Sequence, residues 1–182
     1  MNESVPPFVP LPVSFEQALL PHRDAAFNLA KWLLRHEQDA EDCVQEAYLR
    51  AYQAFSRFRG EDGKTWLLTI VRNFCYSRLR QQRRQEPPVS FDEAVHGDEA
   101  VKGESPWGHS LARELLPRAL EQLPVEAREV LVLHEIEGLA YREIATIAEI
   151  PLGTVMSRLA RARQKLQQEM NQLIRKELPR GL

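Results

Sequence analysis

Two stretches of the chain carry several basic side chains and no acidic one, which is the pattern of an anion-binding surface. Residues 72–85 contain five arginines, and residues 150–168 contain three arginines and one lysine. Arginine and lysine bind phosphate through charge-assisted hydrogen bonds, so both stretches are candidates for contact with nucleic acid. Residues 86–105, which lie between them, have a net charge of −5. The sequence therefore predicts two basic surfaces separated by an acidic segment.

The second basic stretch lies in a pattern typical of a helix-turn-helix. Two runs of apolar residues at helical spacing predict its helices: Ile144, Ala145 and Ala148, then Val155, Leu159, Ala162 and Leu166. A polar stripe runs about 110° away from the second apolar face: Thr154, Ser157, Arg158, Arg161 and Lys165. In a helix-turn-helix the second helix enters the major groove, where Arg contacts guanine or phosphate. A solvated helix face would carry the same residues, so the pattern alone leaves that alternative open.

Motifs of the common enzyme classes are missing. The sequence contains no P-loop, no Gly-rich dinucleotide-binding motif, no GxSxG and no HExxH. Its five histidines lack the spacing of metal ligands, and its two cysteines, Cys43 and Cys75, lie 32 residues apart, which excludes a CxxC zinc site. Both cysteines are expected in the core, with a redox role as the alternative. The sequence predicts no enzyme, no cofactor and no metal site.

The composition is that of an ordinary globular protein. Of the 182 residues 43% are hydrophobic and 27% are charged, with a net charge of −2. The sequence has no run near 18 apolar residues and no basic segment followed by an apolar core at its start, so neither membrane insertion nor secretion is expected. With only two cysteines, the cytoplasm is the expected location.

Apolar periodicity predicts an all-α protein with two small helical domains, because strand-like alternation is absent. In the first domain, residues 14–85, one helix is expected from about Pro21 to His36 and another from Asp39 through Phe58. A third helix is expected to begin near Thr65 and to end in the first basic stretch. One exposed face of the second helix lies opposite its apolar residues: Asp42, Gln45, Glu46 and Leu49.

The second domain, residues 110–182, is expected to end in the helix-turn-helix. Four helices are predicted in this domain. One lies before Pro124, the next ends at Gly138, a short one spans residues 143–148, and a long one reaches toward Glu177. The composition of residues 86–109, with their prolines, glycines and acids, predicts a flexible acidic linker. The proline-rich residues 1–13 are predicted to form a disordered arm.

Three segments together resemble bacterial extracytoplasmic-function (ECF) sigma factors. The fourth conserved region of that family closely resembles GLAYREIATIAEIPLGTVMSRLARARQKL, residues 138–166. The second conserved region resembles DAEDCVQEAYLRAY, residues 39–52, and FRGEDGKTWLLTIVRNFCYSRLR, residues 58–80. The matches occur in the family's order, and the third region is absent, as it is in ECF members. The resemblance implies a protein that binds RNA polymerase core, melts promoter DNA and directs promoter-specific transcription initiation.

The resemblance also implies a role for each surface. The residues implied to bind the clamp coiled coil of the largest polymerase subunit are Asp42, Gln45, Glu46 and Leu49. A second set corresponds to the family's reader of the −10 element, which needs aromatic faces and phosphate clamps for unstacked bases: Arg59, Lys64, Trp66, Arg72, Asn73, Tyr76, Arg78 and Arg80. A third set corresponds to its reader of the −35 element: Thr154, Met156, Ser157, Arg158, Arg161 and Lys165.

This sequence departs from the family pattern at three places. Met156 stands where Lys is usual, which favours an apolar contact such as a thymine methyl over a phosphate. Glu149 stands where Gly is frequent, and the GEDGKT loop is one residue shorter than the commonest form. The expected partners are RNA polymerase core, promoter DNA and an anti-sigma factor.

Two other functions fit part of the sequence. A helix-turn-helix regulator acting without polymerase would leave the Asp42–Glu46 face and the first basic stretch unexplained. A protein-interaction adaptor with a degenerate DNA surface would have no affinity for promoter DNA, even with core polymerase present.

Overall fold

The computed structural model describes residues 13–60, 62–85 and 109–177, and every regular element within these ranges is a helix. The predicted all-α fold class is therefore confirmed. No helix in this part of the chain is long and apolar enough to cross a membrane. The predicted arm, residues 1–13, and the predicted linker, residues 86–109, lie outside the described residues except for their last positions.

The first unit, residues 13–85, contains six helical elements. They are α1 (Phe15–Leu19), η1 (Leu20–His22), α2 (Arg23–Leu34), α3 (Glu37–Ala54), η2 (Phe55–Arg57) and α4 (Gly63–Gln85). A capping box starts α1, because the Ser14 hydroxyl accepts from the backbone N–H of Gln17 while the Gln17 side chain accepts from the N–H of Ser14. Pro21 lies in the first turn of η1, where its missing N–H costs no hydrogen bond.

Helix α3 buries the predicted apolar face against α2 and α4. It begins two residues before Asp39 and ends at Ala54, so the prediction of a helix continuing to Phe58 was wrong. The chain leaves the α-helix because Phe55 and Phe58 stack at 5.4 Å in an aromatic cluster that includes Phe15 and Trp66. Tertiary packing therefore overrides a helical spacing that the sequence alone would extend.

Asp62 positions the start of α4. Its carboxylate accepts hydrogen bonds from the backbone N–H groups of Lys64 at 3.0 Å and Thr65 at 3.2 Å. Partial burial acts to raise the pKa of Asp62, but a hydrogen bond from the Thr65 hydroxyl and these two backbone bonds together lower it. Gly63 follows, and a Cβ there would collide with the backbone carbonyl oxygen of Ala18 in α1. A glycine is therefore needed where α4 passes α1.

The second unit, residues 109–177, contains five elements. They are α5 (His109–Glu121), α6 (Val125–Leu131), the π-helical segment η3 (Val132–Ile136), α7 (Tyr141–Ala148) and α8 (Leu152–Glu177). Gly138, with a φ of 69°, turns the chain between η3 and α7. Glu149 ends α7 with a φ of 55°, a left-handed conformation that favours glycine.

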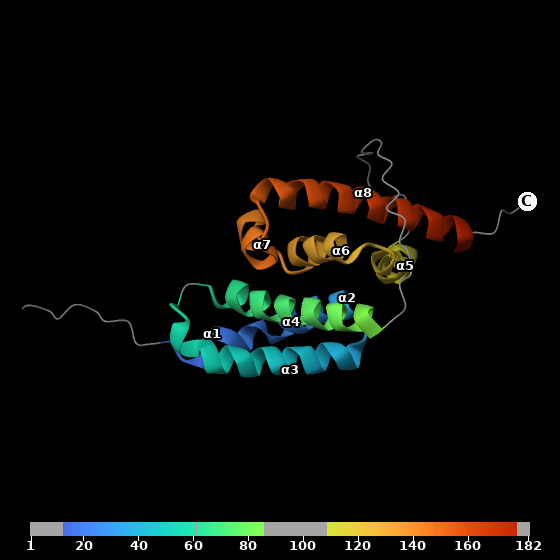
Figure 1. Cartoon of the computed structure of the whole chain (residues 1–182). Coiled ribbons are helices and arrows are strands. Elements are labelled where there is room, and N and C mark those ends of the chain that lie inside the picture. Colours follow the sequence, from blue (N-terminus) through green and yellow to red (C-terminus); the bar gives the residue numbers. More distant parts are fainter. Residues whose placement is uncertain (1–12, 61, 86–108, 178–182) are drawn as a thin grey trace, which may run out of the picture.

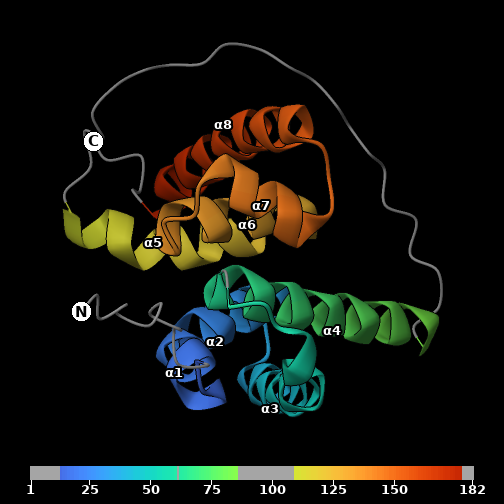
Figure 2. The ribbon, with the colours of Figure 1, turned by 90° about the vertical axis from the view of Figure 1, so that its left-hand side faces the viewer.

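The two units pack directly against each other. Helix α4 lies between α3 on one side and α6 and α7 on the other, and α2 also contacts α6 (Figures 1 and 2). One continuous apolar core contains residues of both units, among them Leu33 and Leu68 of the first and Val130 and Ile147 of the second. The described residues therefore form a closed arrangement rather than two separated domains.

Candidate polymerase and nucleic-acid interfaces

The first candidate surface is the outer face of α3. Asp42, Gln45, Glu46 and Leu49 are all exposed, and the Leu49 side chain is 57% exposed. The structure adds Tyr52, which is 66% exposed and packs edge-on against Phe15. Tyr52 was not among the predicted residues, although its spacing of three residues from Leu49 places it on the same face. The face therefore combines two carboxylates with two apolar side chains.

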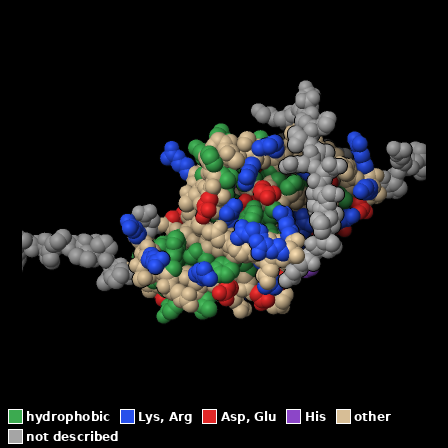
Figure 3. All heavy atoms as spheres, in the orientation of Figure 1, with side chains coloured by type: hydrophobic (Ala, Val, Ile, Leu, Met, Phe, Trp, Pro, Cys, Tyr) green, Lys and Arg blue, Asp and Glu red, His purple; other side chains and the backbone are tan. Residues whose placement is uncertain are grey.

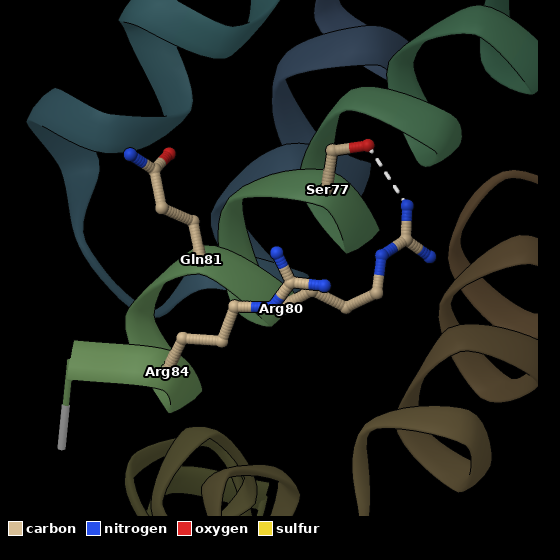
Figure 4. A pocket seen from close by; sticks show the side chains of 4 residues that line it. All are labelled: Ser77, Arg80, Gln81 and Arg84. Atoms are coloured by element: carbon tan, nitrogen blue, oxygen red, sulfur yellow. Dashed lines mark hydrogen bonds between the residues drawn. The ribbon is translucent and has the colours of Figure 1, made fainter.

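The second half of α4 presents a basic surface. Lys and Arg side chains gather there on the face seen in Figure 3. Ser77, Arg80, Gln81 and Arg84 line an open depression of about 480 Å³, where the Arg80 guanidinium donates to the Ser77 hydroxyl at 3.0 Å (Figure 4). Arg84 was not among the predicted site residues, although it belongs to the first basic stretch. Two arginines therefore give this open depression a positive charge.

Arg78 lies on the α3 side of α4. Its guanidinium contacts the Asp39 carboxylate at 2.8 Å, and the Gln82 amide contacts the other oxygen of that carboxylate at 3.4 Å. Arg78 therefore joins α4 to the start of α3. Arg59 and Asn73 are exposed.

Arg72 and Tyr76 share one carboxylate of the second unit. The Arg72 Nε donates to Oε1 of Glu129 at 2.6 Å, and the Tyr76 hydroxyl donates to Oε2 at 2.9 Å. The Arg72 guanidinium also lies 4.4 Å from the centre of the Tyr76 ring. The side chain of Glu129 is fully buried and that of Arg72 is 15% exposed. Helices α4 and α6 are thus joined by a buried ion pair.

Burial controls the titration of this cluster. Desolvation raises the pKa of Glu129, although Arg72 and the Tyr76 hydroxyl both act to lower it. Desolvation also raises the pKa of Tyr76, and the Glu129 carboxylate adds to that rise. The contacts with Arg72 and Tyr76 therefore offset only part of the cost of burying the carboxylate.

Lys64 and Trp66, at the start of α4, also make internal contacts. The Lys64 ammonium donates to the backbone carbonyl of Glu137 at 2.7 Å and contacts its carboxylate at 3.3 Å. Trp66 is half-buried, 5.1 Å from Phe58 between ring centres, and so contributes to the aromatic cluster. Of the residues predicted to read the −10 element, Lys64, Arg72 and Tyr76 are therefore occupied by the second unit.

The helix-turn-helix is formed by α7 and α8. Val155, Leu159 and Ala162 are buried, which confirms the predicted apolar face of α8. In the predicted polar stripe Ser157, Arg161 and Lys165 are exposed, and Thr154 and Arg158 are half-buried. Met156, also predicted to read the −35 element, is exposed. Arg161 folds back on its own helix, donating to the Ser157 carbonyl at 3.3 Å. Lys165 lies 3.8 Å from Glu169 of the same helix.

The two cysteines lie side by side. The sulfur atoms of Cys43 in α3 and Cys75 in α4 are 3.3 Å apart, and both residues are buried, as predicted. The Cys43 sulfur and burial raise the pKa of the Cys75 thiol, so it stays protonated. In the described part of the chain, no group of three His, Cys, Asp or Glu side chains could hold a metal ion.

Comparison with protein families gives two matches. Residues 19–85 match the model of Sigma-70 region 2, and residues 113–166 match that of Sigma-70, region 4. The chain is 34% identical over 171 residues to the RNA polymerase sigma-H factor of Pseudomonas aeruginosa, covering 89% of each chain. It is 37% identical over 148 residues to the ECF RNA polymerase sigma-E factor of Escherichia coli K12, covering 76% of this chain and 77% of that protein.

Solved structures give matching folds. The sigma factor RpoE in complex with the anti-sigma factor NepR, from Bartonella quintana, superposes with a TM-score of 0.68 at 32% identity. That match covers 86% of this chain and 96% of RpoE. CnrH in complex with the cytosolic domain of CnrY gives a TM-score of 0.61 at 26% identity, covering 86% of this chain and 87% of CnrH.

Proposed function

The chain belongs to the ECF sigma factors of RNA polymerase, and from this membership we propose which of its surfaces carries each step of promoter recognition. It binds RNA polymerase core and directs promoter-specific initiation, and it is not itself an enzyme. Residues 14–85 are assigned to core binding and the −10 element, and residues 110–182 to the −35 element. Residues 86–109 connect these two domains, and residues 1–13 precede the first.

The outer face of α3 is assigned to the polymerase. Its exposed residues are Asp42, Gln45, Glu46, Leu49 and Tyr52. Carboxylates beside large exposed apolar side chains suit a basic partner surface with an apolar centre, because charge complementarity steers the encounter and apolar burial stabilises the complex. In the family this partner is the clamp coiled coil of the largest subunit. This exposed face is the observation that carries the proposal.

The two basic surfaces are assigned to DNA. On α4 and the loop before it, the groups for the −10 element are Arg59, Lys64, Trp66, Arg72, Asn73, Tyr76, Arg78 and Arg80. On α8 the groups for the −35 element are Thr154, Met156, Ser157, Arg158, Arg161 and Lys165. The exposed Met156 supplies an apolar contact within an otherwise polar stripe. Such a contact suits a thymine methyl in the major groove.

Two further assignments rest on the relatives. RpoE was solved with the anti-sigma factor NepR, so an anti-sigma factor is a proposed partner of this chain. The place of action is the cytoplasm, where polymerase and promoters are found.

A charge reversal on α3 tests the proposal. Asp42→Lys combined with Glu46→Lys should lower affinity for core polymerase by a factor of at least about 30, since losing one side of a desolvated charge pair costs about 2–5 kcal/mol. The free energy of unfolding should change by less than about 0.5 kcal/mol for each of these exposed positions. The measurements are core binding by fluorescence anisotropy and transcription from a promoter library.

The matched control is Glu16→Lys combined with Glu114→Lys, which reverses two exposed charges elsewhere. It should leave core binding unchanged. Normal promoter-specific transcription by the α3 variant would overturn the assignment of this face. A regulator acting without polymerase would keep its full activity after the same change.

A further inference from the structure

The two cysteines of the chain meet where α3 packs against α4. The sulfur atoms of Cys43 and Cys75 are 3.3 Å apart, and the Cys43 sulfur also lies 3.8 Å from the backbone carbonyl oxygen of Val71 in α4. A disulfide bond is about 2.05 Å long, so the two sulfurs need to approach each other by only about 1.3 Å to form one. The packing of the first unit therefore already brings together two thiols that an oxidant can join.

The two thiols differ in how an oxidant can reach them. Cys75 is fully buried, whereas Cys43 is 7% exposed. Asp39 lies one turn before Cys43 on α3, Arg78 lies one turn after Cys75 on α4, and their ion pair of 2.8 Å closes this edge of the contact between the helices. The Arg78 side chain is 48% exposed, so solvent comes within one turn of the sulfurs. A small oxidant that enters here meets Cys43 first.

The charges around the pair also favour Cys43 as the attacking group. The hydrogen bond with the Cys75 thiol lowers the pKa of Cys43, and the positive charge of Arg78 adds to this effect against burial and the charge of Asp39. The Cys43 sulfur and burial raise the pKa of Cys75. The thiolate, which is the nucleophile in thiol oxidation, therefore forms at Cys43, and Cys75 stays a thiol beside it.

We propose that Cys43 and Cys75 form a peroxide-sensitive dithiol, whose oxidation joins α3 to α4 by an intramolecular disulfide. The Cys43 thiolate attacks one oxygen of hydrogen peroxide, the O–O bond breaks, and the departing hydroxide takes up the proton lost by Cys43, which gives water and a sulfenic acid at Cys43. The Cys75 sulfur then attacks the sulfenic sulfur and expels hydroxide, which takes the Cys75 proton and leaves as a second water. In sum, each thiol loses one electron and one proton, and one peroxide is reduced to two waters.

The disulfide would connect two helices that carry different surfaces of the protein. Helix α3 bears the exposed face with Asp42 and Glu46, and α4 bears the basic surface with Arg80 and Arg84. The bond would close a loop between positions 32 residues apart, which restricts the unfolded chain and so favours the folded one. A dithiol reductant would reverse the bond by thiol–disulfide exchange.

Peroxide treatment of the full chain tests the proposal without ambiguity about the site, because the sequence contains only these two cysteines. The folded chain with a small molar excess of hydrogen peroxide should lose about 2 Da in its intact mass and regain it with dithiothreitol. A non-reducing digest should contain a peptide pair joined through Cys43 and Cys75. Two thiols that remain open to alkylation when the treated chain is denatured would overturn the proposal.

Thermal unfolding shows whether the bond fits the native packing. The melting temperature of the oxidised chain, followed by circular dichroism, should exceed that of the reduced chain by at least about 5 °C, because the link restricts the unfolded state. The control is Cys75→Ser treated in the same way, whose melting temperature should not rise. A disulfide-bonded chain that melts at a lower temperature than the reduced chain would show that the bond does not fit the native packing of the two helices, and the proposal would fall.

Single substitutions test the order of attack. Cys75→Ser leaves Cys43 without its partner, so peroxide should produce a sulfenic acid that dimedone traps when the chain is then unfolded. Cys43→Ser is the matched variant and should give at least tenfold less of this adduct, because the remaining thiol is fully buried. Equal or reversed yields would overturn the assignment of Cys43 as the attacking thiol.

A charge substitution tests the edge through which the oxidant enters. Arg78→Gln removes the cation that favours the Cys43 thiolate, so disulfide formation should become severalfold slower. Arg80→Gln is the matched control, because Arg80 lies on the same helix but contacts Ser77 instead, and it should leave the rate unchanged. Equal rates in the two variants would overturn the role of Arg78.

Discussion

Arg128 is a buried charge with incomplete hydrogen bonding. It is 2% exposed, and its Nε lacks a hydrogen-bond partner. One guanidinium nitrogen, Nη1, donates to the backbone carbonyl of Glu121 over a long 3.5 Å. Burial, together with the nearby charge of Arg35, lowers the pKa of Arg128 to about 10. The folded chain therefore stabilises this cation less than water does.

Replacing this cation by an apolar side chain should stabilise the protein. Arg128→Met keeps most of the volume and removes the uncompensated charge, so the free energy of unfolding should rise by about 1 kcal/mol or more. Urea denaturation followed by circular dichroism measures the change. Arg118→Met, which removes a half-exposed partner of Glu177, should alter stability by less than about 1 kcal/mol. A clear loss of stability in Arg128→Met would contradict this account.

For single residues, the sequence predicted which side chains are exposed to solvent better than it predicted which side chains contact each other. The exposure of Asp42, Glu46 and Leu49 followed from helical geometry alone. The contact of Arg72 with Glu129 did not, because it joins residues 57 positions apart whose approach depends on how two units pack. The adjacent cysteines, 32 positions apart, were missed as a pair for the same reason. Periodicity describes the face of a helix but not what covers it.

At the scale of elements, the close passage of α4 over α1 depends on one missing side chain. Gly63→Ala would press a methyl group against the backbone carbonyl of Ala18, which cannot move as a flexible side chain could. The free energy of unfolding should fall by about 1–3 kcal/mol, as in other overpacked sites. Thermal and urea denaturation measure the loss.

Gly153 in α8 provides the matched control. A Cβ there meets no atom within 4 Å, and the residue lies inside a helix. Gly153→Ala should therefore leave stability unchanged or raise it by up to about 1 kcal/mol, because alanine favours the helix. Equal effects of the two substitutions would show that the contact with α1 is unimportant.

The stripe on α8 should make DNA binding depend on salt. Each phosphate neutralised contributes about −0.9 to the slope of log affinity against log salt. Arg158→Ala combined with Arg161→Ala should weaken holoenzyme binding to promoter DNA and flatten that slope by about 1–2 units. Arg175→Ala with Lys176→Ala, at the far end of α8, should leave the slope unchanged. An unchanged slope in the first variant would mean that these arginines do not contact phosphate.

Element boundaries show where local rules apply and where they stop. The start of a helix near Pro21 and the end of a helix before Gly138 were predicted from the sequence, because proline and glycine act within one turn. The end of α3 at Ala54 and the π-helical segment η3 were not, since both depend on side chains packed from distant elements.

For the whole molecule, the shared core predicts that the halves stay together after the chain is cut. A glutamate-specific protease should cut first within residues 86–105, which hold four of the chain's glutamates. The two fragments should then elute as one species in gel filtration, because α6 and α7 remain packed on α2 and α4. Fragments of the Glu129→Lys chain should separate more readily. Early cuts within residues 39–80, or separate elution of the unmodified fragments, would contradict the closed arrangement.

The contact between Glu129 and Arg72 also constrains how the two halves can diverge. A substitution on α6 that removes the carboxylate leaves a buried cation on α4, and a substitution on α4 leaves a buried anion on α6. Neither half can therefore change this position alone without a loss of fit in the other. A hybrid that joins the first half of this chain to the second half of a relative lacking the acidic residue would leave Arg72, which is also assigned to the −10 element, without its buried partner. Promoter preference and the packing between the two halves are therefore inherited together.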